Sequence, residues 1–240
     1  NQKVNQFQAE SDLYTIIVEE FFRMMYLFHK CENSRKENMM KLIRQIQLLI
    51  KASSSPHLFN EWTGEDKLPS KYAQVIKNCK TWKNEKVAIG TTFKDTAQDY
   101  YLHLSKVFGH RPVFLITGDD SFKKRNSIIR QFEASGNGIL VSTQQSLKSS
   151  VNIPTCNKVI VTDMQWNIPK ISQYYFRFIR FNSTEKKEVY FLTYDKTIEQ
   201  NILALLMRKE QLNDVIKTKE YKEDSQIFAE FDIDMDIFNS

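Results

Sequence analysis

Three short apolar runs between Ile139 and Leu192 constrain the fold of this chain more than any other stretch. The runs are Ile139–Val141, Val159–Val161 and Val189–Leu192, and each is followed by polar or basic residues. Apolar runs this short, bounded by turn signals, predict strands buried on both faces, as in a parallel sheet. In such sheets the chemistry gathers in loops at the carboxyl ends of the strands. Functional side chains are therefore expected directly after these runs.

Strands and helices alternate along the chain from residue 86 onward. Further short strands are expected at Lys86–Gly90 and Pro112–Thr117. Between and after the strands, the pattern predicts helices at Lys94–Val107, Ser121–Glu133 (with Ser121 as N-cap), Ile171–Arg180, Thr197–Lys209 and Leu212–Lys219. This order predicts an α/β fold with a mainly parallel, doubly wound sheet of about five strands.

The first 55 residues have the pattern of two helices. Apolar residues recur at helical spacing from Leu13 to Phe28, and Ser34 and Glu37 have the spacing of a capping box that would begin a second helix. Ser53–Pro56 would end it. The sequence therefore predicts a helical hairpin over residues 1–55. A connecting segment over residues 56–85 follows, with a helix at Ser70–Trp82.

Charge is unevenly distributed. The chain carries 34 Lys and Arg and 29 Asp and Glu residues, but only one of the basic and seven of the acidic residues lie in the tail 220–240. The preceding body therefore has a net charge of +11, which suits a polyanion such as nucleic acid. In the tail, Ile227–Phe238 alternates apolar residues with aspartates. This pattern indicates either an added edge strand or an acidic peptide that covers a basic surface or docks on a partner.

Several kinds of site are not expected. The three cysteines (Cys31, Cys79 and Cys156) are far apart and the four histidines are scattered, so no metal site is predicted and a reducing, intracellular location (cytoplasm or nucleus) is expected. No apolar run is long enough to span a membrane, so no membrane partner is expected. With six glycines and no GxxxxGK[ST] loop, the chain is not expected to bind and hydrolyse a nucleotide unaided.

Two arginines and a glutamine are the first candidate site. Arg177 and Arg180 are three residues apart, and Gln173 lies four before Arg177, so all three would share one helix face. Two guanidinium groups beside an amide suit a triphosphate, because arginine offers bidentate donors to phosphate oxygens. The alternative is a basic helix surface without a ligand.

Hydroxyl-bearing residues at strand ends are the second candidate site. Thr91 follows one strand, and Ser142, Thr143 and Lys148 follow another. Hydroxyl and amine donors of this kind bind a nucleic-acid backbone, although polar loops that cap helices have the same composition. Trp166 could stack on a base, or it could be a packing residue.

The order of these pieces resembles the second RecA-like lobe of superfamily-two helicases, specifically the Swi/Snf-type DNA translocases. The pieces are a strand ending in Thr91, Leu115–Asp119 with Arg125 and Phe132 behind it, Ser142-Thr143, Asp163-Met-Gln-Trp166-Asn167-Ile-Pro169, Gln173-x-x-x-Arg177-x-x-Arg180, and the run Val189–Leu203. Residues 1–55 and Pro56-His57-Leu58 resemble the helical insertion before this lobe. The resemblance implies a RecA-like parallel sheet flanked by helices over residues 86–219, with a helical insertion before it and a helical, acidic tail at 220–240.

The resemblance also implies roles for individual residues. Arg177 and Arg180 would act as arginine fingers at an ATP site shared with a first lobe, with Gln173 supporting them and Asn152 near the ribose. The phosphates of a tracked strand of duplex DNA would lie against Thr91, Ser142, Thr143 and Lys148, with Trp166 and Asn167 beside that path. ATP and Mg²⁺ would be bound mainly by the first lobe, whose nucleotide-binding residues do not occur in this sequence.

Departures from the family pattern leave other functions open. Phe176 replaces a glycine before the first arginine, and the loop after Thr143 has lost its glycines. A degenerate lobe that docks nucleic acid or protein without turnover is therefore the main alternative. A nuclease or other phosphoesterase is a third possibility, which is disfavoured because no Asp, Glu and His residues cluster at the expected strand ends.

Overall fold

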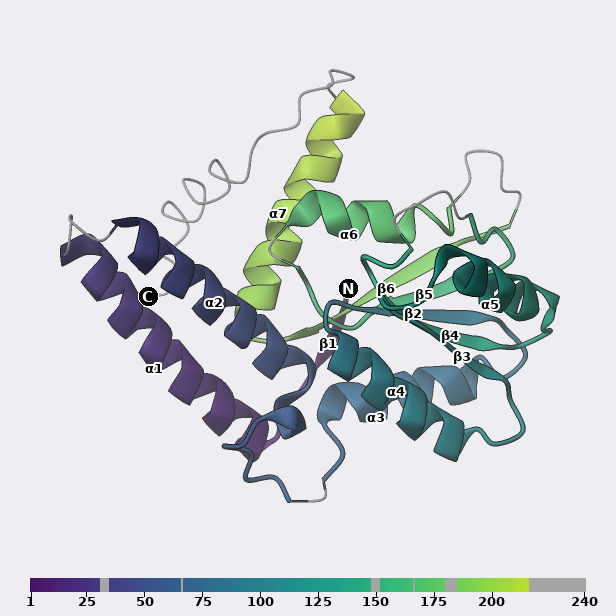
Figure 1. The fold of residues 1–240 in the computed structure, drawn as a ribbon, viewed down its shortest axis with the longest axis horizontal. Helices are drawn as coiled ribbons and strands as arrows, with labels where there is room; N and C mark the ends of the chain where they lie inside the picture. The colour runs from purple at the N-terminus through teal and green to yellow at the C-terminus, as the bar shows by residue number, and fades with distance from the viewer. Residues whose placement is uncertain (31–34, 66, 148–151, 166, 180–184, 216–240) are drawn as a thin grey trace.

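A single parallel sheet organises the computed structural model, which describes residues 1–215 except 31–34, 66, 148–151, 166 and 180–184 (Figure 1). The strands are β1 (Gln2–Val4), β2 (Val87–Thr91), β3 (Val113–Ile116), β4 (Ile139–Thr143), β5 (Lys158–Val161) and β6 (Glu188–Tyr194). Their order across the sheet is β1-β6-β5-β2-β4-β3, and every neighbouring pair is parallel. The predicted α/β fold with a parallel sheet is confirmed.

Alternation along the central strands separates two cores. Val87 and Ile89 of β2 pack with one apolar cluster and Ala88 with the other. Helices α3 (Ser70–Thr81) and α4 (Lys94–Val107) cover the first face, while α5 (Phe122–Ala134), α6 (Ile168–Tyr175) and α7 (Ile198–Val215) cover the second (Figure 1). Because β2 and β4 are buried at every residue, their sequences show no polar face.

The N-terminal hairpin consists of α1 (Gln8–Lys30) and α2 (Arg35–Ser54), which lie side by side, followed by the short 3-10 helix η2 (Pro56–Leu58) (Figure 1). Apolar residues of both helices, among them Leu13 and Leu49, join the core that covers the second sheet face. His57 of η2 contacts Asp99 of α4, with 2.7 Å between the ring Nε2 and Oδ2. The hairpin is thus packed onto the sheet and its helices.

Three predicted elements differ from the structure. Gln2–Val4 is a strand, not helix, because its residues extend the sheet by pairing with Leu192–Tyr194 of β6. The helix α6 ends at Tyr175, since the following residues form successive tight turns that bury Phe178. The helix α7 runs unbroken to Val215, with no glycine or proline to interrupt it. The predicted N-cap at Ser121 is confirmed by its bond from the Lys124 N–H. The predicted capping residue Ser34 and the tail 220–240 lie outside the described residues.

None of the described helices combines the length and the apolar character that a membrane crossing requires.

Gly90 in β2 is required by the close approach of α6. A Cβ atom at Gly90 would lie 2.3 Å from the nearest ring carbon of Tyr174. The Tyr174 side chain is buried in the core. The absence of a side chain at Gly90 therefore lets the helix pack directly on the strand.

We expect Gly90→Ala to lower the free energy of unfolding by about 1–3 kcal/mol, because the added methyl group overpacks a filled core. Gly109→Ala is the matched control, since a Cβ there has nothing within 4 Å. Urea unfolding followed by circular dichroism measures both variants. Equal unfolding midpoints would contradict the steric role of Gly90.

Candidate functional site

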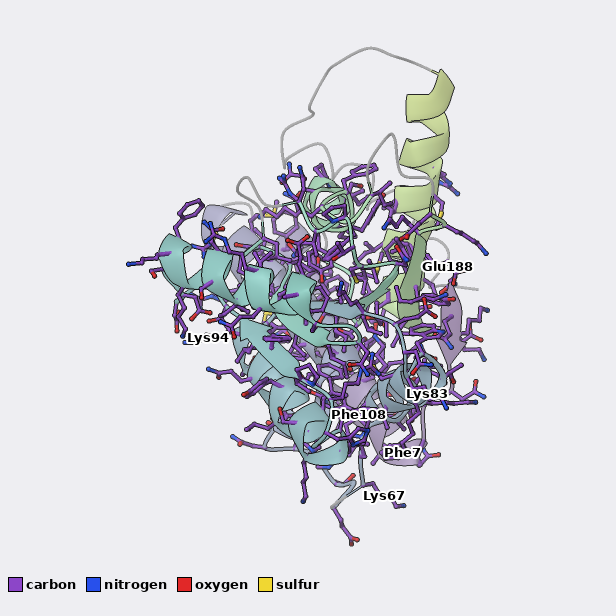
Figure 2. All side chains as sticks on the ribbon, turned by 90° about the vertical axis from the view of Figure 1, so that its right-hand side faces the viewer. Phe7, Lys67, Lys83, Lys94, Phe108 and Glu188 are labelled. Atoms are coloured by element: carbon purple, nitrogen blue, oxygen red, sulfur yellow. The ribbon has the colours of Figure 1, made fainter. Side chains whose placement is uncertain are left out.

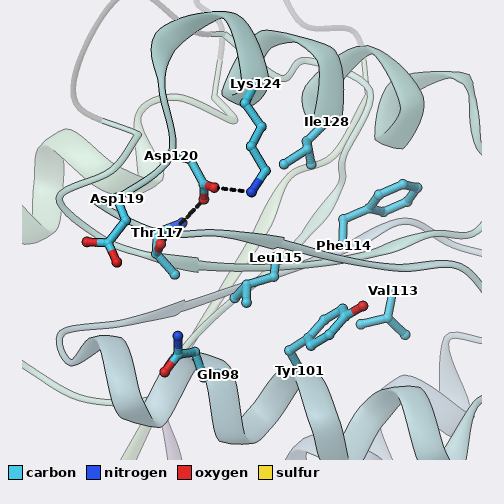
Figure 3. Close-up of a pocket in the computed structure, with 10 residues that line it drawn as sticks. All are labelled: Gln98, Tyr101, Val113, Phe114, Leu115, Thr117, Asp119, Asp120, Lys124 and Ile128. Carbon is cyan, nitrogen blue, oxygen red and sulfur yellow. Dashed lines mark hydrogen bonds and ion pairs between the residues drawn. The ribbon is translucent and has the colours of Figure 1, made fainter.

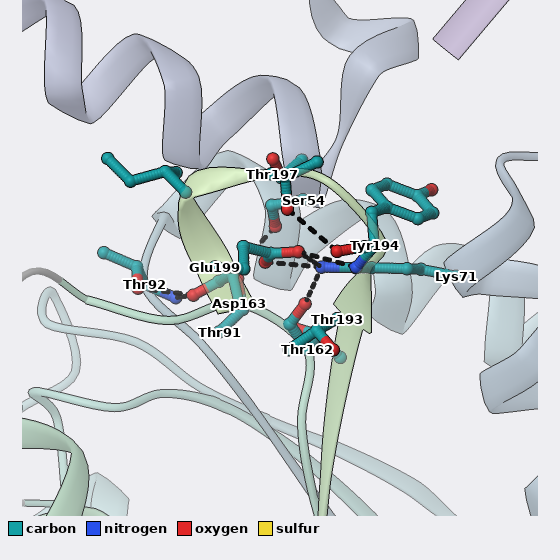
Figure 4. Close-up of polar contacts among 12 residues, drawn as sticks. Ser54, Lys71, Thr91, Thr92, Thr162, Asp163, Thr193, Tyr194, Thr197 and Glu199 are labelled. Atoms are coloured by element: carbon teal, nitrogen blue, oxygen red, sulfur yellow. Dashed lines mark hydrogen bonds and ion pairs between the residues drawn. The ribbon is translucent and has the colours of Figure 1, made fainter. Parts of the chain in front are cut away.

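Asp163 is the centre of the carboxyl edge of the sheet (Figure 4). It follows β5 and is completely buried. Its carboxylate accepts hydrogen bonds from Ser54 Oγ at 2.7 Å, from Thr91 Oγ1 at 2.5 Å, and from the backbone N–H and hydroxyl of Thr92, the N–H at 2.7 Å. A buried carboxylate needs such donors to offset the loss of water. This one residue thereby joins the end of α2 to the ends of β2 and β5.

Two glutamines extend this network toward the loop after β4. The side-chain amide of Gln144 donates to the Asp163 carbonyl oxygen at 3.0 Å, and the Gln165 amide donates to Gln144 Oε1 at 3.0 Å. The backbone N–H of Gln144 also donates to the Thr91 carbonyl oxygen at 2.8 Å. The loop that follows Ser142 and Thr143 is therefore held to the loop after β5 and to the end of β2.

A second buried network is centred on Lys71 and Glu199 (Figure 4). It includes the backbone of Thr162, the residue before Asp163. The ammonium group of Lys71 in α3 is 2.6 and 2.8 Å from the two carboxylate oxygens of Glu199 in α7, and it donates to the Thr162 carbonyl oxygen at 2.7 Å. Both side chains are 0% exposed. Burial raises the pKa of the Glu199 carboxyl to about 7, and the attraction of Lys71 opposes that shift. Because Lys71 and Glu199 are far apart in sequence, their pairing was not predicted.

The predicted nucleotide-facing residues lie at the end of α6. Gln173 is exposed on this helix, Arg177 is half-buried in the turn that follows it, and Asn152 is exposed. The backbone N–H of Ile153 donates to the Arg177 carbonyl oxygen at 2.8 Å, which brings Asn152 beside Arg177. Arg180 lies outside the described residues. The expectation that both arginines extend from one helix is wrong for Arg177, because the helix ends at Tyr175.

Of the four predicted DNA-facing residues that the structure describes, three are buried. Thr91 and Ser142 are 0% exposed and Thr143 is 6% exposed. The Thr91 hydroxyl is used by Asp163, and the Ser142 hydroxyl lies 3.4 Å from that of Tyr174. In this conformation the Thr91 and Ser142 side chains cannot contact a DNA strand. Asn167 is half-buried at the start of α6, and Lys148 and Trp166 lie outside the described residues.

Sequence reasoning assigned no role to the residues that hold this edge together, although Asp163 was part of a quoted motif. The signal for Asp163 was its place directly after a buried strand, and Thr92 and Gln144 each follow a predicted site residue. Lys71 and Glu199 had no local signal. Within the described residues, no group of three or more His, Cys, Asp or Glu side chains could hold a metal ion.

Comparison with known families finds one domain model. Residues 70–182 match the helicase conserved C-terminal domain. This range begins with α3 and Lys71 and includes β2 to β5, α6 and Arg177. The matched domain therefore contains both buried networks except for the ends of α2 and α7.

Two curated proteins are similar to part of the chain. Zorya protein ZorD of Escherichia coli O139:H28 is 29% identical over 149 residues, which are 58% of this chain and 14% of that protein. The SNF2 domain-containing protein CLASSY 2 of Arabidopsis thaliana is 26% identical over 129 residues, 53% of this chain and 10% of that protein. The chain thus corresponds to a small part of each relative's length.

Solved structures share the fold. The C-terminal part of the Fun30 ATPase domain has a TM-score of 0.68 at 17% identity, covering 85% of this chain and 87% of that one. The C-terminal domain of the Sulfolobus solfataricus SWI2/SNF2 ATPase has a TM-score of 0.67 at 21% identity, covering 91% and 89%. The core of the same ATPase in complex with dsDNA matches with a TM-score of 0.67 at 20% identity, covering 90% of this chain and 45% of that one.

The two kinds of comparison agree. Residues 70–182 match the helicase conserved C-terminal domain, and the described fold is shared with the C-terminal parts of the Fun30 and SWI2/SNF2 ATPases. Like them, the chain has a RecA-like parallel sheet with helices on both faces, preceded here by a helical hairpin.

We expect Lys71→Met to destabilise the lobe by about 3–5 kcal/mol, because it leaves the Glu199 carboxylate buried without its cation. Adding Glu199→Gln should restore part of that loss. Urea unfolding measures both variants.

The control for this pair is Lys3→Met, which breaks the exposed pair of Lys3 with Asp195, at 61% and 54% side-chain exposure. It should change the free energy of unfolding by about 1 kcal/mol or less. A Lys71→Met effect no larger than this control would contradict the role assigned to the buried pair.

Proposed function

We propose that this chain is the C-terminal motor lobe of an ATP-dependent translocase on duplex DNA. The observation that carries the proposal is the hydrogen bond from Ile153 N–H to the Arg177 carbonyl oxygen, at 2.8 Å. This backbone contact joins the residue after Asn152 to Arg177, two residues beyond the end of α6, and Gln173 is exposed in the last turn of that helix. Three donor-bearing residues thus come from neighbouring backbone segments within the range that matches the helicase C-terminal domain, which supports the proposal.

The hydrogen-bond donors of these residues fit the phosphate groups of a nucleotide. Guanidinium and amide N–H groups bind phosphate oxygens, and Arg177 and Gln173 provide them. A magnesium ion prefers carboxylate oxygens, and the described residues offer no cluster of metal ligands. We therefore assign the magnesium ion and most nucleotide contacts to a first RecA-like lobe, which lies outside these 240 residues.

We assign a role to each of the four candidate residues at this place. When bound between the two lobes, ATP would supply the free energy for movement. Arg177 and Arg180 donate to phosphate oxygens and stabilise the negative charge that develops on them. Gln173 holds the arginines in place, and Asn152 approaches the ribose.

Contacts to DNA follow from charge and from position. The body of the chain carries a net charge of +11, which favours a phosphate backbone. The SWI2/SNF2 ATPase core that shares this fold was solved in complex with dsDNA. We assign the tracked strand to the loops after β4 and β5, with contacts from Thr143, Lys148, Trp166 and Asn167. Contacts from Thr91, Ser142 and Thr143 would require the carboxyl ends of β2 and β4 to become more exposed, because all three side chains are buried.

Phe176 favours one other function. This side chain is 55% exposed beside Arg177 and replaces a glycine of the family pattern. An exposed aromatic ring at this position suits contact with a protein surface. The alternative is therefore a lobe that docks a partner without supporting ATP turnover.

The two functions differ in ATP turnover. In the parent protein with its first lobe, Arg177→Ala or Arg180→Ala should lower DNA-stimulated ATP hydrolysis by about 10³-fold or more, because arginine fingers contribute at least that much to phosphoryl transfer. Duplex binding should change little. Arg130→Ala, which removes an exposed arginine of α5, is the control. Full turnover in both finger variants would contradict the arginine assignment, and absence of turnover in the parent protein would favour the docking module.

Lys148→Ala should weaken duplex binding and lower the slope of log affinity against log salt concentration by about 0.9, the value for one phosphate contact. Fluorescence anisotropy between low and moderate salt measures this slope. Lys80→Ala is the matched control, because Lys80 is exposed near the end of α3, toward the amino ends of the strands. A slope that is equal in the two variants would remove Lys148 from the DNA path.

A further inference from the structure

The strand β3 has an open side. It is the last strand of the sheet, and among the described residues it pairs only with β4. The Pro112 carbonyl oxygen accepts from the Ile139 N–H at 2.9 Å, so Pro112 directs its backbone toward β4. In a parallel strand, both polar groups of one residue point to the same side and successive residues alternate. The N–H and C=O groups of Val113 and Leu115 therefore face outward.

The next outward N–H group is already satisfied. The Thr117 N–H donates to the Asp120 carboxylate at 2.7 Å, and that carboxylate also pairs with Lys124 at 2.6 Å (Figure 3). The edge is thus closed at its carboxyl end. What stays open is the short segment from Val113 to Leu115.

A groove of about 480 Å³ lies along this edge and has a wall on each side of the sheet (Figure 3). Val113 and Leu115 lie on the side of Tyr101 in α4, while Phe114 lies on the side of Ile128 in α5. Figure 2 shows the molecule from the direction of this edge. Side chains of an added strand alternate between two faces. Here one face would meet Tyr101, and the other would meet Phe114 and Ile128 with the charged side chain of Lys124 beside them.

The two edges of the sheet differ in their protection. The opposite edge strand, β1, has only three residues, and the charged side chain of Lys3 pairs with Asp195 there. By contrast, β3 reads Val-Phe-Leu-Ile, with no charged residue within it. Proteins shield edges by short strands, charges or a covering segment. The strand β3 is also short, at four residues, but it lacks the charged residue that shields β1, which favours a covering segment.

The chain itself contains a segment of matching pattern, outside the described residues. In Ile227–Phe238, Phe231, Ile233, Met235 and Ile237 alternate with Asp232, Asp234 and Asp236. In a strand, the apolar residues would face one side and the aspartates the other. Apolar residues toward Tyr101 would place the aspartates toward α5, where Lys123 is exposed and Lys124 pairs with Asp120.

We propose that Ile227–Phe238 binds the open edge of β3 as a seventh strand. Eleven residues separate Val215, the end of α7, from Ile227. A chain of this length spans up to about 40 Å, and we propose that the pairing forms within one molecule. Bound there, it hydrogen-bonds Val113 and Leu115 and covers the groove.

Amide hydrogen exchange, measured residue by residue, tests this pairing. In the full chain, the N–H groups of Val113 and Leu115 should exchange at least about tenfold more slowly than in the double variant Ile233→Asp/Met235→Asp, which loses the apolar face. The Phe114 N–H, which points to β4, should exchange equally in both and so reports that the sheet is intact. A matched variant, Asp234→Asn, keeps the alternation and should keep the protection.

Addition in trans gives a second readout. A chain ending at Lys219 should show fast exchange at Val113 and Leu115, and a synthetic peptide of residues 225–240 should restore protection. A peptide of the same composition without the alternation should not. Equal exchange in the full chain and the double variant would overturn the proposal. Protection that is lost on dilution would assign the groove to the tail of a second copy and overturn the pairing within one molecule.

Discussion

The described structure depends on two buried carboxylates at the carboxyl edge of the sheet. Asp163 draws together the ends of α2, β2 and β5, and Glu199 holds Lys71 of α3 against the beginning of α7. Neither carboxylate is exposed to water, so each is stable only while its donors stay in place. Hydroxyl, amide and ammonium donors from segments far apart in sequence are therefore fixed at one edge. The hairpin, the sheet and the last helix are coupled through these contacts.

This arrangement explains why the predicted phosphate-binding hydroxyls are buried. Thr91 follows the strand beside β5, so its hydroxyl is within reach of Asp163 and is used to satisfy it. Other donor-bearing residues lie further out: Gln173 is exposed on α6, and Arg177 is half-buried in the turn after it. The chain thus has an inner layer of buried polar contacts and an outer layer of less buried polar side chains. The function that we propose requires both layers, because a group that stabilises developing charge must be held by a fixed support.

Much of the fold was predictable from local pattern. The strands β2 to β6 were expected within a few residues, since each is a short apolar run between turn signals, and Ser121 was expected to cap α5. The strand β1 was not expected, because three residues are too few to show a period and their conformation comes from β6. The end of α6 was also missed. Local spacing suggested that the helix continues to Arg180, but the burial of Phe178 turns the chain after Tyr175.

The sequence by itself determined the class of fold, the order of its elements and the residue types that the proposed phosphate and DNA contacts would use. These follow from local periodicity and motif order, which are properties of the sequence alone. Tertiary structure alone decided which polar side chains are buried in internal hydrogen bonds and which are exposed. Asp163, Lys71 and Glu199 find their partners across 72 to 128 residues of chain. Such partners are set by the packing of helices on the sheet, and no local pattern specifies them.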